Sequence, residues 1–409
     1  MRTLKLKIPH TEQLDALNAA SASVWGECLN FKSVWDYAHG YRTTGRIDKQ
    51  CELWMDKQLS KSHPLHSQSI QAVRERYFKN RKAYRALRRN GNHTTAKPPH
   101  KSKRFQTTTW KKSAIRFKET LLGKVVRLSN GKGNHPPLQI QLPKSFNLSI
   151  VSDIVIVNLV YTHGHYELHF VYNTEKTDAS KANGVAGVDI GEIHPIVSHD
   201  GQNTLIFNGR YIRSLYRLRN KALASMNAKI DRCQRHSKRW WHLVRRKWKR
   251  IRKIDHQIKD ALHKHTTTFV KYCSESGIGT IAIGDLTGIR ENIDYGKRAN
   301  QKLHQWAFGK VRELITYKAK AVGIKVELID EAYTSQTCPN CGNRKKPHTR
   351  NYHCAPCGFK YHRDGVGAIN IRQKYLGHFG VPVGADMGNQ TMKMTPPVGF
   401  RLEVRCCSA

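Results

Sequence analysis

Four cysteines in two CxxC pairs carry the clearest chemical signal in this chain. Cys338 and Cys341 form the first pair, Cys354 and Cys357 form the second, and twelve residues separate the pairs. Four thiolates with this spacing are typical of a closed tetrahedral zinc site, which stabilises a loop and takes no part in catalysis. We therefore predict one structural Zn²⁺ in a zinc-binding loop at 338–357.

Carboxylates lie on both sides of this loop and at the end of an earlier apolar segment. Glu331 precedes the cysteines, Asp364 follows them, and Asp189 ends the run VAGVD. Taken singly, Asp189 fits a turn residue and Asp364 fits a helix cap. Carboxylates contributed by separate elements also bind two Mg²⁺ or Mn²⁺ ions, which activate water and stabilise the leaving oxygen of a phosphodiester. We favour this second interpretation because the acids fall where the expected fold needs them.

The elements that would position these acids follow the succession of an RNase H-like fold. The expected order is three hairpin strands within 185–207, helices within 210–275, strand 280–286, helix 302–323, strand 325–330 and a helix from about 365 to 375. In this succession Asp189 ends the first strand and Asp364 begins the last helix.

The first half of the chain has a different pattern. Residues 2–8 alternate basic and apolar side chains, as a strand with one wet face would. Amphipathic helical spacing runs from Thr11 to about Leu87, and short alternating runs rich in Val, Ile and Thr follow from Thr107 to Asn173. We predict a small β-barrel that the N-terminal strand rejoins, with the helices inserted into it.

Charge points to a polyanionic partner. The chain has 71 Lys and Arg against 30 Asp and Glu, a net charge of +41, which is typical of proteins that bind nucleic acid. Between Arg74 and Lys118 sixteen basic residues accompany one acid, and between Arg210 and Asp255 seventeen accompany two, with aromatic residues interleaved in both. Such mixtures suit backbone contacts and base stacking, although a solvated helix face with core aromatics gives the same pattern. The candidate nucleic-acid-binding residues are Arg81, Lys82, Arg85, Arg88, Arg89, Lys101, Lys103, Arg104, Arg217, Lys238, Arg239, Arg245, Arg246, Lys249 and Arg250.

Nothing in the sequence indicates a membrane or export. It has no run of 18 apolar residues, and its first residues lack the apolar core of a signal peptide. The six cysteines outside the pairs follow no ligand spacing and are expected to be reduced thiols. We expect an intracellular protein, in the cytoplasm or nucleoid if the host is prokaryotic.

Five segments together resemble the TnpB family of transposon-encoded, RNA-guided DNA nucleases, relatives of type V CRISPR effectors and Fanzor proteins. They are GVDIG around Asp189, IAIGDL, YTSQTCPNCG, the second CxxC and HRDGVGAINI around Asp364, and they span about 184–375. The resemblance implies a multidomain α/β and β protein with a RuvC-like nuclease domain. It also implies a monomeric complex with a guide RNA, and target DNA cut beside a short adjacent motif.

The domain layout implied by the resemblance divides the chain into five parts. These are a wedge-like barrel (1–10 and 106–178), a helical recognition domain (11–105), the RuvC-like domain (184–337 and 358–378), the inserted zinc ribbon (338–357) and a C-terminal tail without assigned structure (379–409).

One departure from the family pattern concerns the second catalytic acid. The family usually has a glutamate where this chain has Gly284, and neighbouring Asp285 should face the opposite side of the strand. Glu331, beyond the end of the adjacent parallel strand, could reach the same metals, as in the relatives where this acid has moved. Asp285 after a register slip and an inactive site are the alternatives. An inactive site would make the protein an RNA-guided DNA-binding repressor, and a transposase in its own right ranks lowest.

Overall fold

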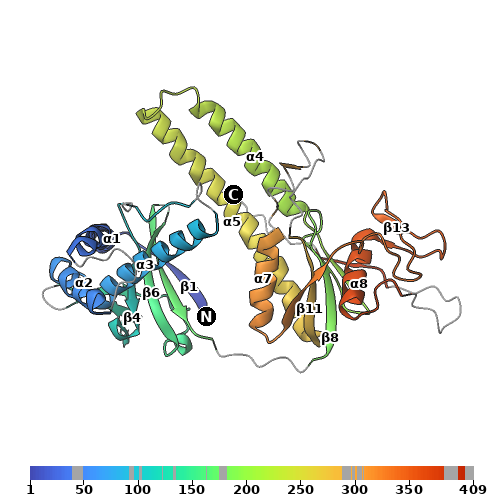
Figure 1. Cartoon of the computed structure of the whole chain (residues 1–409), viewed down its shortest axis with the longest axis horizontal. Coiled ribbons are helices and arrows are strands. Elements are labelled where there is room, and N and C mark those ends of the chain that lie inside the picture. Colours follow the sequence, from blue (N-terminus) through green and yellow to red (C-terminus); the bar gives the residue numbers. More distant parts are fainter. Residues whose placement is uncertain are drawn as a thin grey trace. The chain divides into compact units, whose positions relative to one another are not determined.

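The fold was analysed in a computed structural model of the chain (Figure 1). It describes residues 1–38, 49–91, 96–100, 104–121, 123–131, 135–162, 164–174, 182–287, 296, 300–301, 306, 308–381 and 395–400, with side chains 31–38, 49–51 and 148 excluded. The chain divides into two compact units, Met1–Glu175 and Lys176–Ala409. Within the described residues no helix is long and apolar enough to cross a membrane.

The first unit combines antiparallel sheets with helices around one apolar core. One sheet has the order β1-β7-β6-β2 and the other β3-β4-β5. Its elements are β1 (Arg2–Ile8), α1 (Glu12–Ala38), α2 (Lys49–Ser62), α3 (Ser67–Arg89), β2 (Thr108–Lys111), β3 (Ile115–Thr120), β4 (Gly123–Leu128), β5 (Leu138–Gln141), β6 (Ile154–Thr162) and β7 (His165–Tyr172). The N-terminal strand does return to the sheet, since β1 pairs with β7 over its whole length. Closure of the sheets into a barrel stays a prediction.

Some residues of the basic, aromatic segment between Arg74 and Lys118 are buried in the core of this unit. Tyr77 and Trp110 are fully buried, so neither ring can stack on a nucleic-acid base. Arg74 is also buried and donates two hydrogen bonds to Asp56, at 2.7 and 3.0 Å. The prediction of a stacking surface is therefore wrong for these aromatic residues. Tyr77 alternates with basic residues because α3 is amphipathic. Trp110 does so because it lies on the buried face of strand β2.

The second unit is built on a six-stranded sheet in the order β12-β11-β8-β9-β10-β15. Strands β8, β9 and β10 are antiparallel neighbours, and β11 and β12 continue the sheet parallel to β8. Its elements are β8 (Gly184–Asp189), β9 (Ile196–His199), β10 (Thr204–Phe207), α4 (Arg210–Ile230), α5 (Lys238–Glu275), β11 (Ile278–Asp285), α7 (Phe308–Lys320), β12 (Lys325–Asp330), β13 (Asn351–His353), β14 (Lys360–His362), α8 (Arg363–Tyr375) and β15 (Val398–Phe400). This is the strand succession expected from the sequence.

Helices α4 and α5 form a long antiparallel hairpin whose far end extends well beyond the sheet (Figure 1). The buried residues of α5 begin at Ile251, so its first turns are not packed into the core. The tail also contributes structure, because β15 pairs in parallel with β10. Three residues are too few to show a periodic pattern, so this strand was not foreseen.

Candidate functional site

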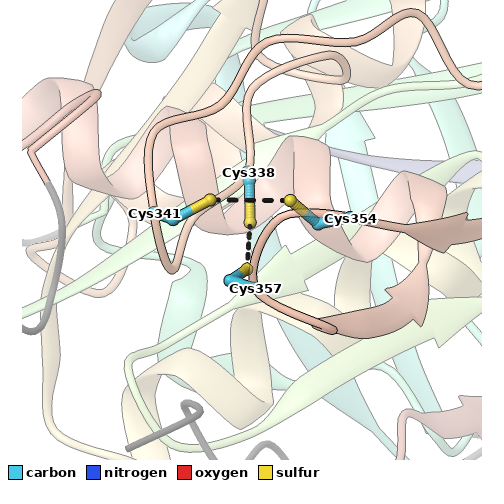
Figure 2. A group of neighbouring side chains, drawn as sticks. All are labelled: Cys338, Cys341, Cys354 and Cys357. Atoms are coloured by element: carbon cyan, nitrogen blue, oxygen red, sulfur yellow. Dashed lines mark hydrogen bonds between the residues drawn. The ribbon is translucent and has the colours of Figure 1, made fainter. Parts of the chain in front are cut away.

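The four cysteines gather into one group, shown in Figure 2. The sulfurs of Cys338 and Cys357 lie 3.6 Å apart, and those of Cys341 and Cys354 lie 3.5 Å apart. Sulfurs bound to one zinc ion at 2.3 Å would be separated by roughly 3.8 Å. The group therefore has the donor type and spacing that a tetrahedral zinc ion needs.

Each cysteine pair sits in a turn of the same kind. The N–H of Gly342 donates to the carbonyl of Cys338 at 3.0 Å, and the N–H of Gly358 donates to the carbonyl of Cys354 at 2.9 Å. The loop then joins the last helix, because the cysteines share a small apolar core with Val366 of α8. The zinc-binding loop is thus tied to the helix that begins beside Asp364.

Asp189 and Asp364 come together because α8 packs against β8. A side chain at Gly367 would place its first carbon 2.8 Å from Asp189 Oδ2, so the absence of a side chain permits the close approach. Burial, and then the negative charge of Asp364, raise the pKa of Asp189 well above the usual range of an aspartate.

Glu331, one residue beyond the end of β12, feels the charge of Asp189. Burial, and then the negative charge of Asp189, raise the pKa of Glu331. Its Oε1 is buried and has no hydrogen-bond partner among the described residues. A carbon atom added at Gly284 would lie 2.0 Å from that oxygen, so Gly284 leaves the space that the Glu331 carboxylate occupies.

Asp285 and Asp330, the acids next to Gly284 and Glu331, have other partners. Asp285 accepts hydrogen bonds from the hydroxyl of Thr287 at 2.6 Å and from Arg312 at 3.1 Å. Asp330 is 76% exposed and pairs with Lys374 at 3.0 Å. The register explains the difference, because Asp285 and Asp330 are paired neighbours on β11 and β12, one position away from Gly284 and Glu331 respectively.

Asp364 has partners that sequence reasoning missed. Its Oδ2 lies 2.7 Å from His194 Nδ1 and accepts a 2.6 Å hydrogen bond from Arg350. His362 caps the helix by accepting the N–H of Asp364 at 3.2 Å. Burial opposes the charged carboxylate, but the hydrogen bond from His194 and the charge of Arg350 keep the pKa of Asp364 low. A lone histidine has no metal-ligand spacing in the sequence. The sequence showed only that His194, in the segment IHP, soon follows Asp189, and this did not predict its contact with Asp364.

Two family models match this chain. "Cas12f1-like, TNB domain" covers residues 308–371, and "Probable transposase" covers residues 169–290. A TnpB-like protein of Methanocaldococcus jannaschii is 32% identical over 29% of this chain and 43% of its own length. These matches support a TnpB-family protein related to type V CRISPR effectors.

Proteins similar in sequence to this chain also include CRISPR effectors. The CRISPR-associated endodeoxyribonuclease Cas12f1 of Sulfoacidibacillus thermotolerans is 35% identical over 30% of each chain. Cas12f2 of a Micrarchaeota archaeon is 26% identical over 54% of this chain and 42% of its own. The matched segments thus span well under two thirds of these relatives.

The fold is similar to that of Cas12f1 in a solved Cas12f1–sgRNA–target DNA complex. The TM-score is 0.61, with 12% identity, over 88% of this chain and 82% of the other. At this identity the likeness concerns the fold alone. The mixed α/β architecture resembling Cas12 effectors therefore extends beyond the segments that match in sequence.

The candidate nucleic-acid-binding residues lie on both units. On α3, Lys82, Arg88 and Arg89 are exposed, and Arg81 and Arg85 are half-buried; Arg104 is exposed, whereas Lys101 and Lys103 lie outside the described residues. In the second unit Arg217, Lys238, Arg239, Arg245, Arg246, Lys249 and Arg250 are exposed. Trp241 and Trp248 are exposed among them on α5. Contact with nucleic acid stays a prediction for all of these residues.

Proposed function

We propose that this protein is a metal-dependent, RNA-guided DNA endonuclease of a transposable element. The observation that carries the proposal is that three carboxylates influence one another in sequence: the charge of Asp364, at the start of α8, acts on Asp189 at the end of β8, and the charge of Asp189 acts on Glu331 beyond β12. Asp189 and Glu331 lie at the ends of two strands of the six-stranded sheet, and Asp364 lies in the first turn of helix α8. An unpartnered carboxylate oxygen in a buried group is what a divalent cation would satisfy.

Two Mg²⁺ or Mn²⁺ ions would be held by these oxygen ligands and would supply an activated water and stabilisation of the leaving oxygen. The protein's part is to orient the three carboxylates and to deliver the phosphodiester between them. Zn²⁺ at Cys338, Cys341, Cys354 and Cys357 would keep the loop between Glu331 and Asp364 in one conformation.

RNA guidance and a DNA target are supported by the relatives and by the charge of the chain. The similar solved structure is a complex of Cas12f1 with sgRNA and target DNA. The net charge of +41 on this chain suits a ribonucleoprotein. We propose that a guide RNA from the element pairs with the target strand and that a short motif adjoins the target.

Plasmid cleavage tests this proposal. The protein, purified together with its bound RNA, is incubated with a plasmid that carries the matching target and a library of adjacent motifs. We expect linear product in Mg²⁺ and none in EDTA, and loss of cutting in Asp189→Asn. Guided binding without cutting at any motif would contradict the nuclease assignment and would favour the repressor.

A further inference from the structure

A basic hollow lies along α4, beside the turn that follows Asp189. Its volume is about 750 Å³, and its lining includes Glu192, Arg210, Arg213, Arg217, Lys221 and Trp306. Pockets of about 300–1,000 Å³ enclose ligands of drug size. This hollow can therefore take one or two nucleotides of a single strand, whereas a duplex is too wide.

The cations of the hollow form a stripe on one helix face. Arg210, Arg213, Arg217 and Lys221 follow one another at intervals of three, four and four residues, which places them on one side of α4 over about 16 Å. Such a stripe can follow several consecutive phosphates.

Three of these cations are available to a ligand. Arg210, Arg217 and Lys221 are exposed, and among the described residues none has an acidic side chain within ion-pairing distance. Arg213 differs, because it donates a 2.9 Å hydrogen bond to Glu192. That pair neutralises the one acid of the lining, so the wall does not repel phosphate.

The hollow also offers an aromatic floor. Trp306 is buried beneath it, and its ring lies 5.5 Å from that of Tyr216, centroid to centroid. Because Trp306 is fully buried, it supports the floor of the hollow from below and does not stack on a base. Contacts with a single strand would therefore come from phosphates meeting the cations.

The position of the hollow connects it to the acidic site. Glu192 follows Asp189 by three residues, in a turn closed by the N–H of Gly191 donating to the carbonyl of His194 at 2.9 Å. The side chain of His194 contacts Asp364 on the other side of this turn. One short turn therefore separates the basic hollow from the carboxylates.

We infer that the α4 hollow binds the sugar-phosphate backbone of the single DNA strand that enters the nuclease site, through Arg210, Arg217 and Lys221. This inference rests on the proposed function, and it assigns to the hollow the delivery of the strand. The order along the stripe predicts that the nucleotides next to the scissile phosphate lie nearest Arg210.

The test measures binding of a short single-stranded DNA that is not complementary to the guide. Wild type and the variant Arg210→Gln/Arg217→Gln/Lys221→Gln are purified with their bound RNA and titrated in Ca²⁺ at several salt concentrations by fluorescence anisotropy. Removing three phosphate contacts should lower the slope of log K against log salt by about 2. Iododeoxyuridine in the same DNA should crosslink to peptides of residues 210–221.

A matched control removes three charges from the other end of the hairpin. Lys229, Arg232 and Arg235 are exposed and do not line the hollow, so their replacement by Gln should leave the crosslink in place and the affinity nearer to wild type. Equal losses in both variants, or a crosslink that involves the bound RNA in place of the DNA, would overturn the inference. If the wild type fails to cut any plasmid while the hollow still binds DNA with these properties, the nuclease proposal fails, and the binding of single-stranded DNA stands without the delivery to a nuclease site.

Discussion

Gly284 is the residue that makes the position of Glu331 possible. The Glu331 side chain fills the volume in front of Gly284, at a distance where an added carbon atom would overlap with it. A side chain at 284 would therefore overlap with Glu331 in its present conformation.

Gly284→Ala should thus displace the carboxylate of Glu331. We expect at least a tenfold loss of Mg²⁺-dependent cleavage, measured as kcat on a labelled target, with an intact fold by circular dichroism. Gly309→Ala is the control, since a carbon atom there meets nothing within 4 Å. Full activity in Gly284→Ala would mean that Glu331 does not need its present position.

His265 shows how a buried residue of the core adds pH dependence to stability. It lies in α5 beside Phe207, and neither ring nitrogen has a hydrogen-bond partner among the described residues. Burial lowers the pKa of His265 to about 4. The unfolded chain takes up a proton near pH 6.5 and the folded chain does not, so stability falls as the pH drops from 6.5 to 4.

His265→Leu should raise the melting temperature at pH 7.5 and reduce its fall at pH 5. Removal of the buried polar ring should raise the free energy of unfolding by about 1–3 kcal/mol at neutral pH. The gain should be larger at pH 5, because the unfolded variant no longer has a histidine at 265 whose protonation stabilises the unfolded state. Differential scanning fluorimetry at both pH values measures this. His199, whose pKa burial also lowers to about 4, remains and keeps part of the dependence. An unchanged fall in the variant would contradict the assignment.

At the scale of elements, α8 holds the segment that carries Glu331. The ammonium group of Lys374 donates to the carbonyls of Asp330 at 3.0 Å and Ala332 at 2.8 Å, on either side of Glu331. The amide of Asn370 donates to the carbonyls of Thr334 and Thr337 at 2.6 and 2.7 Å. The helix that begins beside Asp364 thereby fixes the turn that holds Glu331.

Lys374→Met should consequently weaken cleavage more than stability. The lost charged hydrogen bonds amount to roughly 1.5–3 kcal/mol, and a misplaced Glu331 should reduce kcat tenfold or more. Lys320→Met, at an exposed position at the end of α7, is the control for loss of one surface charge. Wild-type kcat with a lowered melting temperature would show that Lys374 stabilises the fold alone.

The zinc-binding loop gives a second prediction for the elements. Cys354→Ser, or chelation of zinc, should release the loop between β12 and α8 and abolish cutting, because the shared core with Val366 is lost. Metal analysis should find one zinc per chain in the wild type and much less in the variant. Cys233→Ser, at a cysteine outside the group, should change neither the zinc content nor the cutting.

For the whole molecule, charge dominates the interaction with nucleic acid. Affinity of the RNA-free protein for RNA should fall by about 10³–10⁵ between 50 and 200 mM salt if six to ten phosphates are neutralised. Filter binding over this range measures the slope. A flat dependence would contradict the interpretation that the excess of positive charge serves a polyanion.

The sequence predicted those features of the molecule that depend on spacing or strand ends. CxxC pairs and acids that end strands leave a local pattern, and the succession of β8 to β12 with their helices followed from the periodic segments of the sequence. The contact of His194 with Asp364 joins residues 170 positions apart, and the strand β15 is too short for a pattern. The stripe on α4 has a helical period, but the hollow exists only once Trp306 and Glu192 are brought beside it.

The central claim is that Glu331, and not Asp285, completes a metal-dependent nuclease site. Its most direct measurement compares target cleavage by Glu331→Gln and Asp285→Asn, each purified with its bound RNA and matched for guided DNA binding. We predict that Glu331→Gln abolishes cutting, by a factor of at least 10³, and that Asp285→Asn retains it within a fewfold, because Asp285 is engaged with Thr287 and Arg312. Cutting by Glu331→Gln, or loss of cutting in Asp285→Asn alone, would contradict this account.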